Sequence, residues 1–214
     1  MPTDRLHGLL ADHLGDLVDR GSAKGAEKVI SEVLPADESR GPRYRIEGQG
    51  ERAFLRMNSN GYLGMSLRPE LIRAEEATAA RFGAGPQAVR FISGTYTPHI
   101  ELEQKLAEFH GRSAAMIMSS AYATIVGVIP SLVTSETALI SDELNHNCII
   151  NAMRVSRPKE KAIYNPNDLN ELEAALEKTA ESNRRAIVVT DGIFSMRGDH
   201  APLAEIEQLV RSFD

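Results

Sequence analysis

The chain has 214 residues, of which 42% are hydrophobic and 25% are charged, a balance that is ordinary for a soluble globular protein. The formal net charge of −6 and the lack of a Lys/Arg cluster give no reason to expect nucleic acid as a partner. The single cysteine, Cys148, excludes an internal disulfide. No apolar run approaches the roughly 18 residues that a membrane span needs, and the charged N-terminus lacks a signal-peptide core. We therefore expect a cytoplasmic protein without membrane contact.

The first 58 residues are predicted to form a helical arm and a hairpin, ahead of a larger domain over residues 59–214. Leucines at helical spacing indicate an amphipathic helix over residues 4–20. A second short helix is expected to end at Leu34, before a proline. Two short strands are predicted to flank the glycine-rich turn 48–51 as a hairpin.

A polar turn and three further elements come next. The turn at 58–64 contains two glycines, and Pro69 is expected at the first position of a helix that runs to about Phe82. Residues 90–95 are predicted to be a short extended piece. Another helix is expected to begin at Thr97.

The next stretch has the pattern of a strand–helix–strand unit. Residues 114–118 are an apolar run with strand character, Ser120 lies in a polar turn, and a helix is predicted over residues 121–133. A second strand over 137–140 leads to His146. Ligands gather at the carboxyl ends of parallel strands, where a helix N-terminus offers N–H groups to an anion. Ser120 and the amides after it are therefore predicted to hold a phosphate, although a plain N-cap is the commoner role for such a serine.

Helices and strands continue to alternate up to the last residues. A helix is predicted over 149–155, a strand over 161–164 and a helix over 167–180. The apolar run 185–190 is predicted to be the most clearly buried strand, and Pro202 is expected to open a final helix. This alternation predicts an α/β fold with a mostly parallel, doubly wound sheet.

Five segments, in this order and at similar spacing, resemble the N-terminal half of the α-oxoamine synthases, pyridoxal-phosphate enzymes of fold type I. They are Ser59–Gly64, Val89–Thr95 with His99 and Leu102–Glu103, Ser119–Tyr122, Ile140–Asp142 with Leu144–His146, and Thr190–Met196. The residues in these segments are most similar to those of the glycine C-acetyltransferase branch. The resemblance implies an incomplete large domain of the aminotransferase class I/II type. It also implies a homodimer with its active site at the interface, and a reaction that condenses an amino acid, first of all glycine, with an acyl-coenzyme A.

The resemblance also assigns roles to individual residues. The cofactor phosphate would be held by Ser120, Ala121 and Tyr122. His146 would stack on the pyridine ring, Ser195 would hydrogen-bond near the phenolic oxygen, and Asn60 would contact the amino-acid carboxylate. On the residues alone, His146 is as well explained as a structural hydrogen-bonder, and Asn60 and Ser195 as ordinary turn residues. No set of metal ligands is predicted.

The catalytic residues implied by the resemblance are missing from these 214 residues. The Schiff-base lysine, with the Asp and His that contact the cofactor ring, is expected after the last residue, so we expect this chain alone to be inactive. The sequence also departs from the family pattern at Asn147, Cys148 and Asn151, where Ala, Ser and Asp are usual, and at Ile125 and Arg197. These departures leave the acyl donor and the amino acid open.

Cys148 itself is expected to be a small buried hydrophobe with no base nearby. Two alternatives to the acyltransferase stay open: a non-catalytic partner subunit of such an enzyme, and a different fold type I enzyme such as an aminotransferase.

Overall fold

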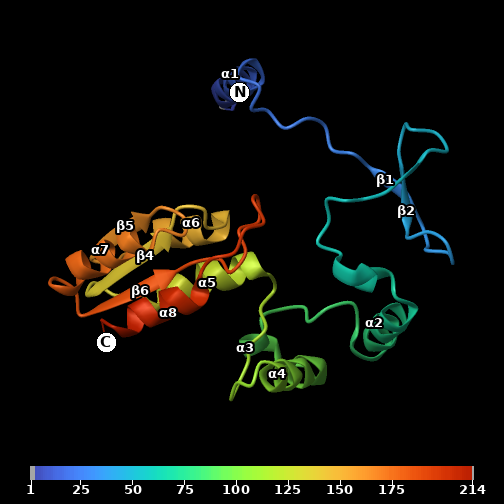
Figure 1. Ribbon diagram of the computed structural model, residues 1–214. Helices are drawn as coiled ribbons and strands as arrows, with labels where there is room; N and C mark the ends of the chain where they lie inside the picture. The colour runs from blue at the N-terminus through green and yellow to red at the C-terminus, as the bar shows by residue number, and fades with distance from the viewer. Residues whose placement is uncertain (1–2, 214) are drawn as a thin grey trace. The chain divides into compact units, whose positions relative to one another are not determined.

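The computed structural model describes residues 3–213 and divides into two compact units, residues 1–94 and residues 95–214, which are treated separately (Figure 1). The sequence predicted a boundary after residue 58, between an N-terminal arm and a larger domain. The division into these two units does not test that boundary, which stays a prediction. Among residues 3–213 no helix is both long enough and apolar enough to cross a bilayer.

The first unit contains a small antiparallel sheet and mostly separate helices. Its elements are α1 (Asp4–Asp19), β1 (Ile30–Leu34), β2 (Arg43–Ile46), β3 (Ala53–Phe54), the 3-10 helix η1 (Tyr62–Leu67), α2 (Pro69–Phe82) and α3 (Arg90–Ser93). The strands pair in the order β1-β2-β3. The predicted first helix, the hairpin and the helix that begins at Pro69 are therefore all confirmed.

Two local predictions in this unit are wrong. Residues 30–34 form strand β1, not the end of a second helix, because they pair along β2, with Val33 opposite Tyr44. The segment contains Ile30 and Val33, whose branched side chains suit a strand once a partner exists. Residues 90–93 form one helical turn, α3, and are not extended. The Ser93 hydroxyl donates to the Val89 carbonyl (3.2 Å) across that turn.

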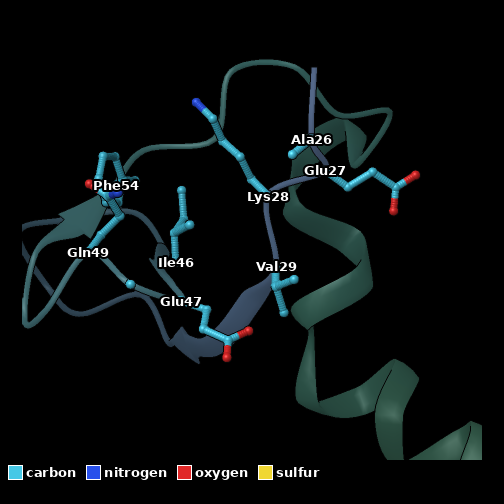
Figure 2. A pocket seen from close by; sticks show the side chains of 9 residues that line it. Ala26, Glu27, Lys28, Val29, Ile46, Glu47, Gln49 and Phe54 are labelled. Atoms are coloured by element: carbon cyan, nitrogen blue, oxygen red, sulfur yellow. The ribbon is translucent and has the colours of Figure 1, made fainter. Parts of the chain in front are cut away.

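A cavity of about 490 Å³ lies between the segment before β1 and the β2–β3 hairpin (Figure 2). Its apolar lining comes from Val29, Ile46 and Phe54, and Lys28 and Glu47 add charged groups. The Glu47 amide donates to the Val29 carbonyl (2.9 Å), which ties the two walls together. None of the predicted site residues lines this cavity.

The second unit is a parallel sheet with helices on both faces. Its elements are α4 (Thr97–Phe109), α5 (Ala121–Leu132), β4 (Thr137–Asp142), α6 (Asn147–Val155), β5 (Glu160–Tyr164), α7 (Leu169–Ala180), β6 (Arg185–Val189) and α8 (Leu203–Arg211). The strands lie in the order β5-β4-β6, and both neighbours run parallel to β4 (Figure 1). The sheet confirms the predicted α/β fold.

Two adjacent residues of β4 show how the sheet is covered. Successive side chains of a strand point to opposite faces, and Leu139 and Ile140 are both fully buried. Leu139 packs in a cluster with Ile129 of α5 and Ile149 of α6. Ile140 packs in the other cluster, with residues of α7 and α8 such as Leu172. Helix pairs on both faces are the arrangement that a doubly wound sheet requires.

Two strand predictions in the second unit need correction. Residues 114–118 adopt no strand, because in the described part of the chain no neighbouring strand pairs with them. The Ile117 amide instead donates to the Glu103 carboxylate (2.9 Å). The most deeply buried strand is β4, whose six residues are all buried, whereas β6 begins with exposed Arg185. The reason is position: β6 is at the edge of the three strands and β4 is central.

Candidate functional site

Ser120, the residue predicted to hold a phosphate, lies directly before helix α5. Ser120 is the N-cap, and its hydroxyl oxygen accepts a hydrogen bond from the Ala123 amide (3.0 Å). The first amides of a helix have no partner within the helix, so those of Ala121 and Tyr122 are the donors that this turn offers to an anion. The structure thus bears out the commoner N-cap role of Ser120. The same geometry suits a phosphate, since a capping hydroxyl keeps its own hydrogen for a second acceptor.

The start of α5 lies toward the carboxyl end of β4. The Leu132 carbonyl at the end of the helix accepts a hydrogen bond from the Arg185 guanidinium at the start of β6. The twelve residues of α5 then run back along the sheet for about 18 Å. The six residues of β4 span roughly 20 Å in the opposite sense. Ser120 is therefore at the same end of the sheet as the residues that follow β4.

The backbone at His146 is held by Asp191, which follows the end of β6. The His146 amide donates to the Asp191 carboxylate (2.7 Å), and the Asp191 amide donates to the side-chain oxygen of Asn145 (2.7 Å). The Asn145 amide group also donates to the Val189 carbonyl (2.7 Å) and to the Ser141 hydroxyl (2.9 Å). Asn145 is only 4% exposed. These bonds join the ends of β4 and β6 and hold His146 at the sheet edge, as a pre-positioned ligand contact requires.

The imidazole of His146 contacts Cys148. His146 is the N-cap of α6, and its Nδ1 accepts a hydrogen bond from the Cys148 amide (3.2 Å). The Cys148 Sγ lies 3.0 Å from the same nitrogen. Cys148 is buried as expected, at 6% exposed, but the expectation that no base lies nearby is wrong. The histidine two residues earlier folds back over the start of the helix.

A second network connects α5 with α6. The Asn151 side-chain amide donates to the Tyr122 hydroxyl (2.6 Å) and to the side-chain oxygen of Asn147. The Arg154 guanidinium donates to the Asn151 oxygen (3.1 Å). Asn147 and Asn151 are two of the departures from the family pattern, and the Asn151 amide links the Asn147 side chain with the Tyr122 hydroxyl. They fix Tyr122, a residue of the predicted phosphate turn, beside the start of α6.

Replacing Asn151 by alanine is expected to lower the free energy of unfolding by about 0.5–1.5 kcal/mol, because one hydrogen bond between the helices is lost. Tyr122→Phe removes the other partner of the same bond and serves as the matched variant. Chemical denaturation of both single variants and the double variant measures the coupling. A loss in the double variant equal to the sum of the two single losses would show that the bond contributes nothing.

Ser195 and Asn60 lie in loops. Ser195 is exposed in the loop after β6, where the Phe194 amide donates to the Asp199 carbonyl (3.0 Å) and closes a tight turn. Asn60 belongs to the first unit and is exposed just before η1. Leu63, in the same turn, has a positive φ of 57°, which a leucine rarely adopts. The structure brings the start of α5 and the start of α6 together, and it places Asn60 within its own unit only.

Two buried groups at the carboxyl ends of the strands have shifted pKa values. Burial raises the pKa of Asp142, which ends β4, although the Leu144 amide donates to its carboxylate (2.8 Å). Burial, together with the negative charge of Asp142, raises the pKa of Tyr164 to about 12. Both groups are therefore less readily ionised than free side chains. Within residues 3–213 no group of three or more His, Cys, Asp or Glu side chains is arranged to hold a metal ion.

Three contributors to the site were not predicted as such: Asn145, Asn151 and the thiol of Cys148. Asp191 acts on the backbone, since its carboxylate accepts the hydrogen bond of the His146 amide. The partners of Asn145 lie up to 46 residues away in sequence, so no local pattern reveals them. A signal did exist for Asn151 and Cys148, since both depart from the family pattern close to His146.

Comparison with protein families gives a match to the model described as aminotransferase class I and II, over residues 52–214. An 8-amino-7-oxononanoate synthase of Bacillus velezensis is 38% identical over 187 residues, which are 87% of this chain and 46% of that protein. The mitochondrial 2-amino-3-ketobutyrate coenzyme A ligase of Bos taurus is 39% identical over 209 residues, which are 98% of this chain and 48% of that protein. The chain thus spans about half the length of these curated relatives.

Among solved structures, a serine palmitoyltransferase from S. paucimobilis with a bound PLP–myriocin aldimine aligns with a TM-score of 0.82. The sequences are 26% identical, and the alignment covers 99% of this chain and 50% of the other. These relatives confirm the resemblance to α-oxoamine synthases and to fold type I. Because two branches match at similar identity, the nearer likeness to glycine C-acetyltransferases stays a prediction.

Proposed function

The chain belongs to the aminotransferase class I and II family, and on that premise we propose that it is the N-terminal, cofactor-holding part of a pyridoxal-phosphate enzyme. The reaction that we propose condenses an amino acid, glycine first, with an acyl-coenzyme A. The observation that carries the proposal is the placement of the α5 start and of His146 together at the carboxyl edge of one parallel sheet. Ligands of open α/β sheets bind at that edge.

The groups at this edge fit pyridoxal phosphate. The phosphate is an anion, and the Ser120 hydroxyl with the amides of Ala121 and Tyr122 supplies donors for it at the positive end of a helix. His146 offers a flat ring at the start of α6, the helix whose Asn151 contacts Tyr122, and the Asp191 and Asn145 bonds hold its backbone. When bound, the cofactor would act as the electron sink for a carbanion, so the protein's part is binding and orientation.

The substrate classes are proposed from the relatives. One is named 2-amino-3-ketobutyrate coenzyme A ligase, and another is named serine palmitoyltransferase. Both names indicate an enzyme that joins an amino acid to an acyl group, but the acyl groups differ. The shared class is therefore proposed for this chain, whereas the acyl length is not. We also propose that the enzyme is a cytoplasmic homodimer with its active site at the subunit interface.

The test is made on the whole polypeptide that carries these 214 residues together with the lysine that the family uses. Purified enzyme is given glycine and acetyl-coenzyme A, and free coenzyme A is followed with a thiol reagent. Release that depends on glycine supports the proposal. Transfer of the amino group to a keto acid without any thioester would establish the aminotransferase alternative. A protein that is inactive alone, but that raises the activity of a lysine-bearing paralogue, would establish the partner-subunit alternative.

Asn60→Ala is expected to lower kcat/KM for the amino acid by roughly tenfold to a hundredfold, because a charged hydrogen bond to the carboxylate, about 1.5–3 kcal/mol, would be lost. Half-saturation by acyl-coenzyme A should stay nearly the same. Asn58→Ala is the matched control, since Asn58 is an exposed asparagine in the same turn. Equal losses in both variants would mean that the turn, and not the Asn60 amide, is responsible.

A further inference from the structure

We propose that Cys148 is a positioning residue that fixes the imidazole of His146 in one tautomer, with the proton on Nε2. The proposal rests on the proposed function, because it takes His146 as the group that meets the cofactor ring. It goes beyond that function by assigning a task to a residue that departs from the family's usual serine.

Two donors from one residue converge on Nδ1. The Cys148 amide donates to it (3.2 Å), so Nδ1 offers its lone pair there. The thiol sulfur lies 3.0 Å from the same nitrogen, and because the Cys148 amide already donates to Nδ1, we infer that the thiol is a second donor to it. A neutral imidazole has one N–H group and one bare nitrogen. With Nδ1 occupied as an acceptor, the single N–H is at Nε2.

The surroundings make this arrangement rigid. Cys148 is only 6% exposed and packs with Ile149, Ala152 and Leu139, so its side chain has little room to turn. The backbone of His146 is held from the other side by Asp191. His146 is therefore held at its backbone and at Nδ1, which leaves the face of the ring and Nε2 for a ligand. A histidine ring that contacts a cofactor is commonly oriented through its second nitrogen in this way.

A thiol and a hydroxyl can each donate a hydrogen bond to Nδ1. Both donate one hydrogen, whereas an alanine at position 148 would keep the amide donor and lose the second one. Cys148→Ala therefore removes the side-chain donor together with the sulfur atom, and Cys148→Ser is the conservative variant that should restore a donor at the same place.

Cys148 is the only cysteine within these 214 residues. In the whole polypeptide, the Raman S–H stretching band that is lost in Cys148→Ala reports this thiol. We expect the band at a lower wavenumber than that of a free thiol, as for a donor to an imidazole nitrogen. We also expect the ¹⁵N shifts of His146, assigned by its loss in His146→Gln, to show a bare Nδ1 and a protonated Nε2. A proton on Nδ1, or an S–H band at the free-thiol position, would overturn the proposal.

The variants provide the second arm. In Cys148→Ala the ¹⁵N shifts should move toward a mixture of tautomers, and in Cys148→Ser they should return to the wild-type pattern. Unchanged tautomers in Cys148→Ala would show that the thiol has no positioning role. If this variant fails to fold, the wild-type spectra and Cys148→Ser decide the question. None of these measurements needs the cofactor, so they can fail or succeed independently of the proposed function.

Binding of pyridoxal phosphate to the whole enzyme then links the two proposals. Cys148→Ala is expected to weaken it by roughly threefold to tenfold, the range of one net hydrogen bond, with recovery in Cys148→Ser. If the tautomer changes as expected but affinity stays constant in every variant of the site, the positioning role stands and the assignment of His146 to the cofactor is wrong.

Discussion

Leu139→Ala is expected to lower the free energy of unfolding by about 2–5 kcal/mol, the range for removing a buried leucine side chain from a packed core. Leu139 is fully buried in the central strand β4 and contacts both helices of one face through Ile129 and Ile149. The cavity that remains would lie between a sheet and two helices, which cannot collapse freely. Chemical denaturation, read by circular dichroism, measures the loss.

Leu132→Ala provides the matched comparison for Leu139→Ala. It removes the same atoms from the last residue of α5, where the side chain is 51% exposed, and surface changes of this kind are usually within about 0.5 kcal/mol. Similar losses in both variants would contradict the described core, because they would mean that β4 is not the strand on which the second unit is packed.

Ser120→Ala is expected to raise the dissociation constant of pyridoxal phosphate by roughly tenfold to a hundredfold, as a charge-assisted hydrogen bond of about 1.5–3 kcal/mol is lost. Absorbance titration of the cofactor into the whole enzyme measures it. The substitution should also lower the stability of the protein without cofactor, because the serine caps α5 through the Ala123 amide. Thermal melting of the variant without cofactor determines that loss, which is typically about 1 kcal/mol.

The neighbouring serine and a shorter ligand make this test specific. Ser119 is exposed and is not the N-cap, so Ser119→Ala should leave the dissociation constant unchanged. Pyridoxal without its phosphate should bind equally to wild type and Ser120→Ala. If Ser120→Ala weakens both ligands alike, the serine supports the fold of the turn and does not contact a phosphate.

The elements that the sequence predicts well are those whose signal is local. Helix α1 follows from leucines at helical spacing, α2 from Pro69 at its first turn, and α7 from the cap at Asp168, which accepts the Asn170 amide (3.0 Å). Strands are harder, because a strand exists only beside another one. Residues 30–34, which include Ser31 and Glu32, pair with β2, whereas the apolar run 114–118 pairs with no strand in the described part of the chain.

The candidate site divides in the same way. Ser120 was predictable because an N-cap depends on its own helix. The clamp of Asn145 and Asp191 on His146 joins residues far apart in sequence, so it needed the sheet to be folded first. Cys148 is a third case: it is two residues from His146, yet its contact depends on how a side chain turns at a helix start. A sequence pattern does not predict the rotamer of that side chain.

The central place of β4 has a consequence for synthesis on the ribosome. β4 acquires its partner β5 on one edge and its partner β6 on the other. The start of β6 follows the end of β4 by about 40 residues in the chain. At roughly 5–20 residues per second, translation needs some 2–8 s for that interval. During this interval, the strand that becomes most deeply buried has an open edge of unpaired backbone groups, and such an edge can pair with another chain and promote aggregation.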